Sequence, residues 1–246
     1  MGGPLGAPHV LLSLERVSKS FGSLAVIDGL SLAVEDGEAL GVIGPNGAGK
    51  TTALNLMIGR LRPDRGAVTF AGQDVTRLPP HARCRAGIAL THQIPHPFEA
   101  LTVFENVLVG ASYGRAGASA EDAAVTALEL TGLTPKANRR AGALTLLERK
   151  RLELARALAT RPRVLLLDEI AGGLTDDELP ELVGLVRRIN AEGVAIVWIE
   201  HIVHALRSVV SRLVAIDVGR LLVQGPPDDV MANADVQRVY LGIDVQ

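Results

Sequence analysis

The sequence predicts an α/β fold with a mostly parallel sheet that is covered by helices on both faces. Strand-like stretches at the start of the chain end with ALGVIG at 39–44. A helical middle then extends from about Thr102 to Thr160. From RVLLLDE at 163–169 onward, near-continuous apolar strands alternate with helices. We therefore expect a single domain over 10–246, with a helical subdomain inserted at 94–160.

Turn residues and periodicity place the individual elements. Strands are expected within 10–21, 25–38 and 39–44, and GKTTALNLMIGR at 49–60 is expected to be a helix that closes near Gly59. GAVTFAGQDV has the pattern of a hairpin with its turn at Gly72, and the flexible GRAGAS interrupts the helical middle. Later elements are the helix DELPELVGLVRRINAEG, the strand VAIVWIE, the helix HALRSVV and the strand RLVAID.

Composition narrows the class of protein. With 48% hydrophobic and 21% charged residues the chain is globular, and its net charge of −2 lacks the basic footprint of a nucleic-acid binder. The single cysteine, Cys84, rules out an internal disulfide. VAIVWI at 194–199 is far shorter than the roughly 20 apolar residues of a membrane helix. We expect a soluble chain that reaches a membrane only through a partner.

GPNGAGKT, from Gly44 to Thr51, matches the phosphate-binding pattern G-x-x-x-x-G-K-[ST] between a strand and a helix. Glycines let the backbone N–H groups wrap a phosphate, and the helix N-terminus adds its dipole. We expect Lys50 to reach the β- and γ-phosphates and Thr51 to bind Mg²⁺. The predicted nucleotide-binding residues here are Gly44, Pro45, Asn46, Gly47, Ala48, Gly49, Lys50, Thr51 and Thr52.

RVLLLDE ends in two carboxylates, Asp168 and Glu169, at the carboxyl end of a predicted strand, where ligands of such sheets bind. We expect Asp168 to hold Mg²⁺ through water and Glu169 to polarise the attacking water. Two solvated carboxylates that only cap a strand are the alternative.

Two further polar residues follow predicted strands. His201 comes directly after VAIVWIE and is placed to bind a γ-phosphate, although a lone histidine there is more often structural. Gln93 ends the probable strand in ALTHQIPHPF, and its side-chain oxygen is placed to reach the metal or the water. Without the other motifs, Gln93 is weak evidence for such a contact.

Together these motifs resemble the ATP-binding subunit of an ABC transporter, and the resemblance extends from about Leu11 to Gly242. It implies a P-loop NTPase cassette with a RecA-like core, an N-terminal antiparallel β subdomain and an inserted helical subdomain. It also implies ATP and Mg²⁺ as cofactors, with Thr51, Gln93 and Asp168 around the metal. Glu169, His201 and Gln93 would then be catalytic.

The same resemblance implies an adenine site and partners. Phe21 would stack on adenine and Val26 would line the same face, although ordinary strand packing also accounts for both. Within the family, THQIPHPFEALTVFENVLVGA, RKRLELARAL and VYLG resemble the importers of branched-chain amino acids. Such a subunit pairs head to tail with a second ATPase subunit on the cytoplasmic face of the inner membrane.

In such an importer, permease subunits dock in a groove near the glutamine, and a solute-binding protein acts through them. In this chain the groove would include Ile94 to Phe98. A rigid proline-flanked turn is an equally good interpretation of that segment. No nucleic-acid partner is expected.

The signature loop departs from the family pattern Leu-Ser-Gly-Gly-Gln. Thr145 stands at the serine position, Leu146 and Leu147 replace the glycines, and Glu148 replaces the glutamine. Thr145 and Glu148 have the spacing of a capping box, so we expect the helix to begin here and Thr145 to face the ATP of the partner. Leu147 either obstructs that phosphate or turns into the core, and helical spacing favours the core.

Two other functions stay open from the sequence. A non-transport ABC ATPase that acts on nucleic acid or the ribosome usually carries a second cassette or a long insertion, which this chain lacks. A regulatory subunit that binds ATP without turnover would explain the leucine pair. The intact Lys50, Asp168, Glu169 and His201 argue against it.

Overall fold

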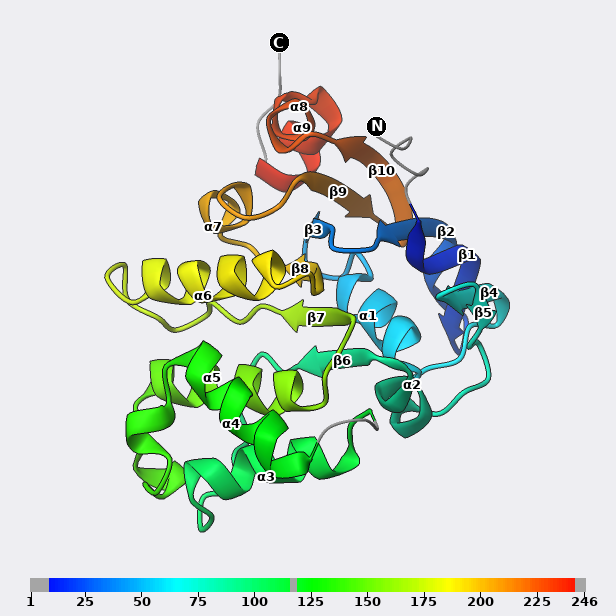
Figure 1. The fold of residues 1–246 in the computed structure, drawn as a ribbon. Helices are drawn as coiled ribbons and strands as arrows, with labels where there is room; N and C mark the ends of the chain where they lie inside the picture. Colours follow the sequence, from blue (N-terminus) through cyan, green and yellow to red (C-terminus); the bar gives the residue numbers. More distant parts are fainter. Residues whose placement is uncertain (1–8, 116–118, 242–246) are drawn as a thin grey trace, which may run out of the picture.

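The computed structural model describes residues 9–115 and 119–241. At its centre lies a six-stranded sheet in the order β10-β9-β3-β8-β7-β6 (Figure 1). Five of these strands run parallel, and β10 pairs antiparallel with β9. The strands are β3 (Ala39–Ile43), β6 (Ile88–Thr91), β7 (Val164–Asp168), β8 (Ala195–Ile199), β9 (Arg212–Asp217) and β10 (Arg220–Gly225). The predicted α/β fold is confirmed.

The central strands are buried on both faces, as β7 illustrates. Val164 and Leu166 belong to one hydrophobic cluster, whereas Leu165 and Leu167 belong to the other. Because successive side chains of a strand point to opposite faces, a strand with both faces covered needs an unbroken apolar run. This requirement explains the apolar run VLLL. Asp168 follows that run as the last residue of β7, at the carboxyl end of the strand.

A second, antiparallel sheet in the order β2-β1-β4-β5 is built mainly from the N-terminal part of the chain. Its strands are β1 (Val10–Phe21), β2 (Leu24–Glu35), β4 (Arg65–Phe70) and β5 (Gln73–Asp74). Ala71 and Gly72 form the predicted hairpin turn with positive φ angles of 49° and 76°. The N-terminal antiparallel part of the predicted fold is thus present.

Helix α1 (Lys50–Ile58) lies between the two sheets (Figure 1). Its side chains Leu54, Leu56 and Met57 join one cluster with residues of β1, β2 and the central sheet. The helix ends at Gly59, as predicted, in the left-handed conformation with φ 84°. A side chain at that position would also come within 2.8 Å of the Leu78 carbonyl oxygen. This burial fixes the helix that carries Lys50 and Thr51 against the sheet.

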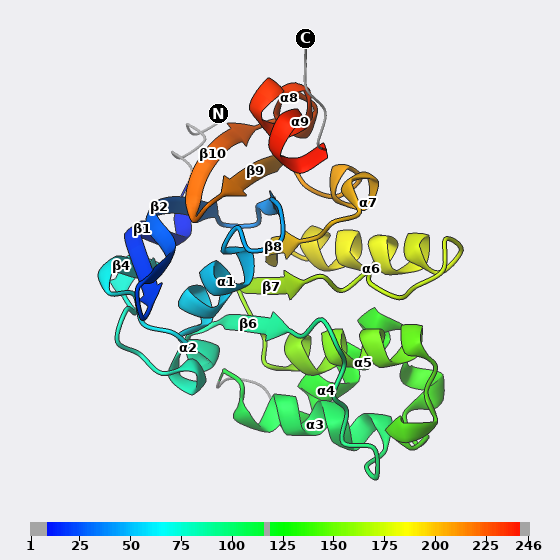
Figure 2. The same ribbon diagram turned by 180° about the vertical axis from the view of Figure 1, so that it is seen from behind.

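Between β6 and β7 the described residues form three helices that pack against one another on one side of the molecule (Figure 2). They are α3 (Val103–Tyr113), α4 (Ala120–Thr131) and α5 (Leu146–Ala159), with short 3₁₀ turns at Thr134–Lys136 and Ala141–Ala143. The inserted helical subdomain is therefore present, and its exact limits of 94 and 160 stay a prediction. The expected flexible stretch GRAGAS includes residues 116–118, which lie outside the described residues.

The remaining described elements agree with the sequence-based predictions only in part. Helix α6 (Leu179–Ala191) covers the central sheet, as predicted from its pattern. The predicted helix HALRSVV is shorter in the structure, where α7 spans Val203–Arg207. Not anticipated were β10 and the short helices α2 (Pro80–Ala86), α8 (Pro227–Ala232) and α9 (Ala234–Leu241). These helices have fewer than nine residues, too few for a clear helical period.

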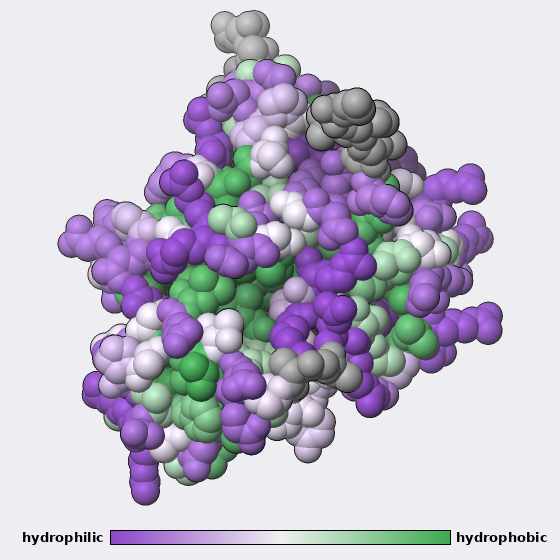
Figure 3. All heavy atoms as spheres, viewed as in Figure 1, coloured by the Kyte–Doolittle hydropathy of each residue, from purple (hydrophilic) through white to green (hydrophobic). Residues whose placement is uncertain are grey.

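Polar residues cover most of the face shown in Figure 3, and apolar residues come to the surface in the hollow between α6 and the helices below it. A hollow of about 460 Å³ between α4 and the end of α6 is lined mainly by apolar side chains, among them Leu130, Leu158 and Val194. Within residues 9–115 and 119–241, none of the helices is long and apolar enough to cross a membrane.

Candidate active site

The predicted phosphate loop connects β3 to α1 and is shaped by its glycines. Gly44, Gly47 and Gly49 have φ angles of 155°, 83° and 98°. A side chain on Gly44 would lie 2.2 Å from the Ile216 carbonyl oxygen, whereas the space beside Gly47 is open. Gly44 is therefore required by the close approach of the neighbouring strand, and Gly47 by its backbone conformation.

Lys50 folds back across this loop. Its side chain is buried, and its Nζ donates to the carbonyl oxygens of Gly44 at 2.7 Å and Pro45 at 3.0 Å. Burial lowers the pKa of Lys50, and the nearby charges of Glu169 and Asp168 act in the opposite direction. The ammonium is thus held over the loop, next to two carboxylates.

Several predicted site residues line one hollow of about 180 Å³ that lies along the loop. Its lining comprises Val26, Asn46, Gly47, Ala48, Gly49, Lys50, Thr51, Thr52 and Glu169. Phe21 is not part of this lining. Its ring is 49% exposed at the end of β1, with Lys19 Nζ 5.9 Å from the ring centroid. The structure therefore places Val26 at the loop and leaves Phe21 exposed on the surface, outside the lining of this hollow.

Two of the three predicted catalytic residues, Gln93 and His201, converge on the carboxylate of the third, Glu169. Gln93 Nε2 donates to Glu169 Oε2 at 2.7 Å, and His201 Nε2 lies 2.8 Å from Glu169 Oε1. Glu169 has φ 47°, an uncommon conformation for a residue other than glycine, and its N–H donates to Ile199 O at 2.9 Å. Gln93 lies two residues beyond the end of β6, not at the strand end itself. Residues that are 76 and 32 positions from Glu169 along the chain thus meet at its side chain.

Asp168 occupies a different environment from Glu169. Burial raises the pKa of Asp168, and the neighbouring Glu169 charge raises it further, against the influence of His92 and Lys50. Its Oδ1 atom is buried and has no hydrogen-bond partner among the residues that the structure describes. A buried, unpartnered carboxylate oxygen is costly, so this atom is a ready ligand for a cation.

Two buried charged residues that the sequence analysis did not single out support this site. Glu200 is 2% exposed, and its carboxylate accepts from the N–H groups of Ala171 at 3.0 Å and His201 at 2.9 Å. Lys150, from α5, is 4% exposed, and its Nζ is 3.5 Å from the carbonyl oxygen of Gln93. The only sequence signal for Glu200 was its place between the apolar strand and His201.

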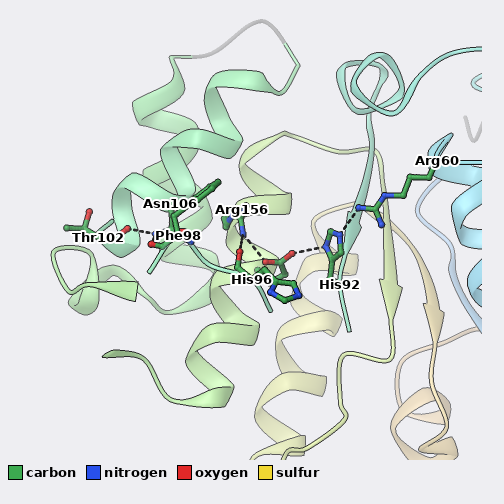
Figure 4. A network of polar contacts seen from close by, with 8 residues as sticks. Arg60, His92, His96, Phe98, Thr102, Asn106 and Arg156 are labelled. Carbon is green, nitrogen blue, oxygen red and sulfur yellow. Dashed lines mark hydrogen bonds and ion pairs between the residues drawn. The ribbon is translucent and has the colours of Figure 1, made fainter. Parts of the chain in front are cut away.

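The segment that carries Gln93 is held by a polar network (Figure 4). Arg60 Nη2 lies 2.6 Å from His92 Nε2, and His92 Nδ1 lies 3.1 Å from Glu153 Oε1. Because arginine can only donate, His92 Nε2 accepts here and Nδ1–H donates to Glu153. The residue beside Gln93 is thus tied both to the end of α1 and to α5.

Further along, the same segment turns outward (Figure 4). Arg156 donates to Glu153 at 3.1 Å and to the His96 carbonyl oxygen at 3.0 Å, and its guanidinium lies 5.0 Å from the Phe98 ring centroid. Asn106 bonds both backbone groups of Phe98. Ile94 and Phe98 remain 66% and 46% exposed. The segment is therefore a fixed turn that presents two large apolar side chains.

The signature segment starts helix α5 as predicted. Thr145 is the N-cap, its hydroxyl accepts from Glu148 N at 3.4 Å, and Glu148 Oε2 accepts from Thr145 N at 3.0 Å. Glu148 also pairs with Lys136. Leu147 is buried in the core, as helical spacing favoured, whereas Leu146 is 41% exposed. Thr145 is not among the residues that line the hollow along the phosphate loop, so its predicted action on the ATP of a partner stays a prediction.

A phosphate loop on an α/β sheet, with acidic residues at the carboxyl end of β7 in the same sheet, defines a nucleotide-binding ATPase of the P-loop class. The family model for ABC transporters matches residues 27–172, and the chain belongs to this family. It is therefore an ATP-binding cassette, an ATPase domain with the predicted P-loop NTPase fold.

Sequence similarity to known proteins extends over nearly the whole chain. It is 34% identical over 249 residues to the high-affinity branched-chain amino acid transport ATP-binding protein BraF of Pseudomonas aeruginosa, covering 94% of this chain and 98% of BraF. Its identity to LivG of Escherichia coli K12, which has the same description, is 35% with the same coverage. The ADP conformation of MJ1267, an ATP-binding cassette of an ABC transporter, superposes with a TM-score of 0.86 at 29% identity, covering 95% of this chain and 99% of that one.

Proposed function

We propose that this chain is the ATP-hydrolysing subunit of an ABC importer for branched-chain or related amino acids. The convergence of Gln93 and His201 on Glu169 is the observation that supports hydrolysis. The descriptions of BraF and LivG, both similar over nearly their whole length, support the substrate class.

In the proposed mechanism, the phosphates of ATP lie in the loop of Gly44–Thr52, and Lys50 turns its ammonium toward them. Phe21 and Val26 would contact the adenine side of the nucleotide. Glu169 accepts the proton of the attacking water, and its two oxygens are held by Gln93 and His201. Because the two neighbours come from loops that follow different strands, β6 and β8, the base is oriented before the nucleotide arrives.

The residues around Asp168 fit a magnesium ion. Asp168 Oδ1 is buried and lacks a hydrogen-bond partner within the described part of the chain, and Mg²⁺ prefers oxygen ligands of this kind. The Thr51 hydroxyl and the Gln93 side-chain oxygen would complete the protein ligands. Bound with ATP, the ion would offset the negative charge that builds up on the phosphates.

A second ATPase subunit is part of the proposal, because Thr145 lies outside the hollow of its own chain. The partner is either a second copy or a paralogue. Leu146 is exposed and adjacent to Thr145. The phosphate of the ATP that the partner binds would therefore meet a leucine side chain, where the family pattern has two glycines. We therefore propose that this chain only weakly assists the hydrolysis of the ATP bound by its partner.

For the permease subunits we propose docking at the turn that presents Ile94 and Phe98. A hollow of about 370 Å³ adjoins it, with Arg60, Cys84 and His92 among its lining residues. His92 neighbours Gln93, so a permease segment seated here would press on the catalytic glutamine. This arrangement would keep the chain on the cytoplasmic face of the inner membrane, and the solute-binding protein would act through the permease.

Steady-state ATPase activity tests the proposal. We expect the purified chain with its permease to hydrolyse ATP, and Glu169→Gln to reduce kcat by roughly 10²-fold or more while ATP still binds. Glu121→Gln, an exposed carboxylate on α4, is the matched control. ATP binding without turnover in the complete complex would instead indicate a regulatory subunit. Leucine uptake into vesicles that contain the complex tests the substrate class.

A further inference from the structure

The C-terminal helix reaches the catalytic site. Tyr240, on α9 (Ala234–Leu241), donates its hydroxyl to the carbonyl oxygen of His201 at 3.1 Å. The two residues are 39 positions apart along the chain. The ring packs against the same hydrophobic core as α6 and β7, so this contact is part of the folded domain.

His201 is consequently held at three points. Its ring Nε2 lies 2.8 Å from Glu169, and its N–H donates to Glu200 Oε1 at 2.9 Å. Tyr240 binds the carbonyl oxygen of the same residue. Two of these three contacts are made to backbone atoms of His201. The position of this backbone sets the direction in which the imidazole points.

Glu200 joins the two sides of the site. Its Oε2 accepts from the N–H of Ala171, two residues after Glu169, while Oε1 holds His201. One buried carboxylate therefore links the segment of the catalytic base to the segment of the histidine. Burial, with Glu200 and Glu169 nearby, raises the pKa of Tyr240 above its ordinary value, so the hydroxyl keeps its proton at neutral pH.

Helix α9 is firmly positioned for this task. Val236 is 1% exposed in the core, and Asn233 Oδ1 accepts from the N–H groups of Asp235 at 2.9 Å and Val236 at 3.3 Å. Gln237 donates to the Met231 carbonyl oxygen at 3.2 Å, which ties α9 to α8. The helix start is thus capped and one face is buried, so Tyr240 projects from a rigid support.

We infer that Tyr240 is a positioning residue for ATP hydrolysis, which holds the His201 backbone so that the imidazole meets Glu169. This inference rests on the proposed roles of His201 and Glu169 in the hydrolysis of ATP. It assigns to helix α9 a part in the active site through a hydrogen bond to the backbone of His201.

Kinetics of the intact subunit with its permease provide the first test. Tyr240→Phe keeps the ring and removes the hydroxyl. We expect kcat to fall about three- to tenfold, the effect of one ordinary hydrogen bond, with KM for ATP and the melting temperature unchanged. Arg238→Gln, on the exposed side of the same helix, is expected to leave kcat unchanged. An unchanged kcat in Tyr240→Phe, or a loss that follows a lower melting temperature, overturns the inference.

An NMR measurement tests the contact without turnover. Of the six histidines, His201 alone precedes an isoleucine, so carbonyl-¹³C histidine with ¹⁵N isoleucine yields one signal, from the His201–Ile202 peptide. We expect Tyr240→Phe to move this signal and Tyr113→Phe, a change in the other tyrosine, to leave it in place. A signal that does not move in Tyr240→Phe overturns the inference.

The two measurements separate this inference from the proposed function. If the wild-type complex shows no turnover at all, the proposed function fails, and the positioning role fails with it even where the NMR signal moves. If the wild type turns over and Glu169→Gln does not, the proposed function stands, and Tyr240→Phe alone decides the inference.

Discussion

Leu146 lies against Gly173, so closely that a side-chain carbon on Gly173 would come within 3.2 Å of Leu146 Cδ2. The signature loop and the loop after Glu169 therefore touch within one chain. Leu147, the next residue, turns the other way and is only 8% exposed. The two leucines that replace the family glycines thus have different roles, one on the surface and one in the core.

Glycine substitutions separate these roles. We expect Leu147→Gly to lower the free energy of unfolding by about 2–5 kcal/mol, because it removes a buried side chain, and not to raise ATPase activity. Leu146→Gly removes an exposed side chain, so we expect a smaller loss of stability and several-fold faster turnover in a homodimer. Urea unfolding and steady-state ATPase assays measure both. Faster turnover in Leu147→Gly at unchanged stability would contradict this assignment.

Arg83 is fully buried and ties α2 to the end of α1. Its guanidinium donates to the carbonyl oxygens of Leu56 at 2.6 Å and Met57 at 2.8 Å, and also to those of Thr76 and Leu78. Burial lowers its pKa to about 10, so it stays charged at neutral pH.

We therefore expect Arg83→Met to lower the free energy of unfolding by about 3 kcal/mol or more, because several buried acceptors lose their donor. Urea denaturation measures the effect. Arg85→Met, an exposed arginine two residues away, is the matched control, and we expect a change of less than about 0.5 kcal/mol there. Equal stability of the two variants would rule out the structural role of Arg83.

The thiol of Cys84 lies at the proposed permease site, and the rate of its alkylation is expected to depend on pH. Burial raises the pKa of its thiol above the ordinary 9.0, and Thr160 and Arg85 only partly oppose this. A raised pKa leaves less thiolate at any given pH, and the thiolate is the nucleophile. We expect alkylation by iodoacetamide at pH 8 to be slower than for a free cysteine, with the rate still rising above pH 9. A rate that levels off below pH 8.5 would contradict the raised pKa.

Phe98 is expected to anchor the permease. We expect Phe98→Ala to weaken binding of the permease about tenfold, because exposed aromatic side chains often dominate interfaces, and to leave ATP binding unchanged. Val125→Ala on α4, with 43% exposure against 46% for Phe98, serves as the control. Co-purification and titration with detergent-solubilised permease measure the affinity. If both variants bind the permease equally well, docking at this turn is wrong.

Local sequence patterns were sufficient for much of the fold. The hairpin turn at Gly72, the helix end at Gly59 and the capping box of Thr145 depend on neighbours within a few residues, and each is present in the structure. The short helices α2, α8 and α9 were not predicted, because so few residues carry no clear period and their stability comes from packing.

By itself the sequence determined the class of protein and the positions of the phosphate loop and the two strand-end carboxylates, since spacing along one segment defines those motifs. Only the tertiary structure decided which side chains meet: that Gln93 and His201 both bind Glu169, that Leu147 is buried while Leu146 is not, and that Tyr240 holds His201. These contacts join segments that are far apart in the chain. Their geometry follows from how helices and sheets pack, which no local pattern records.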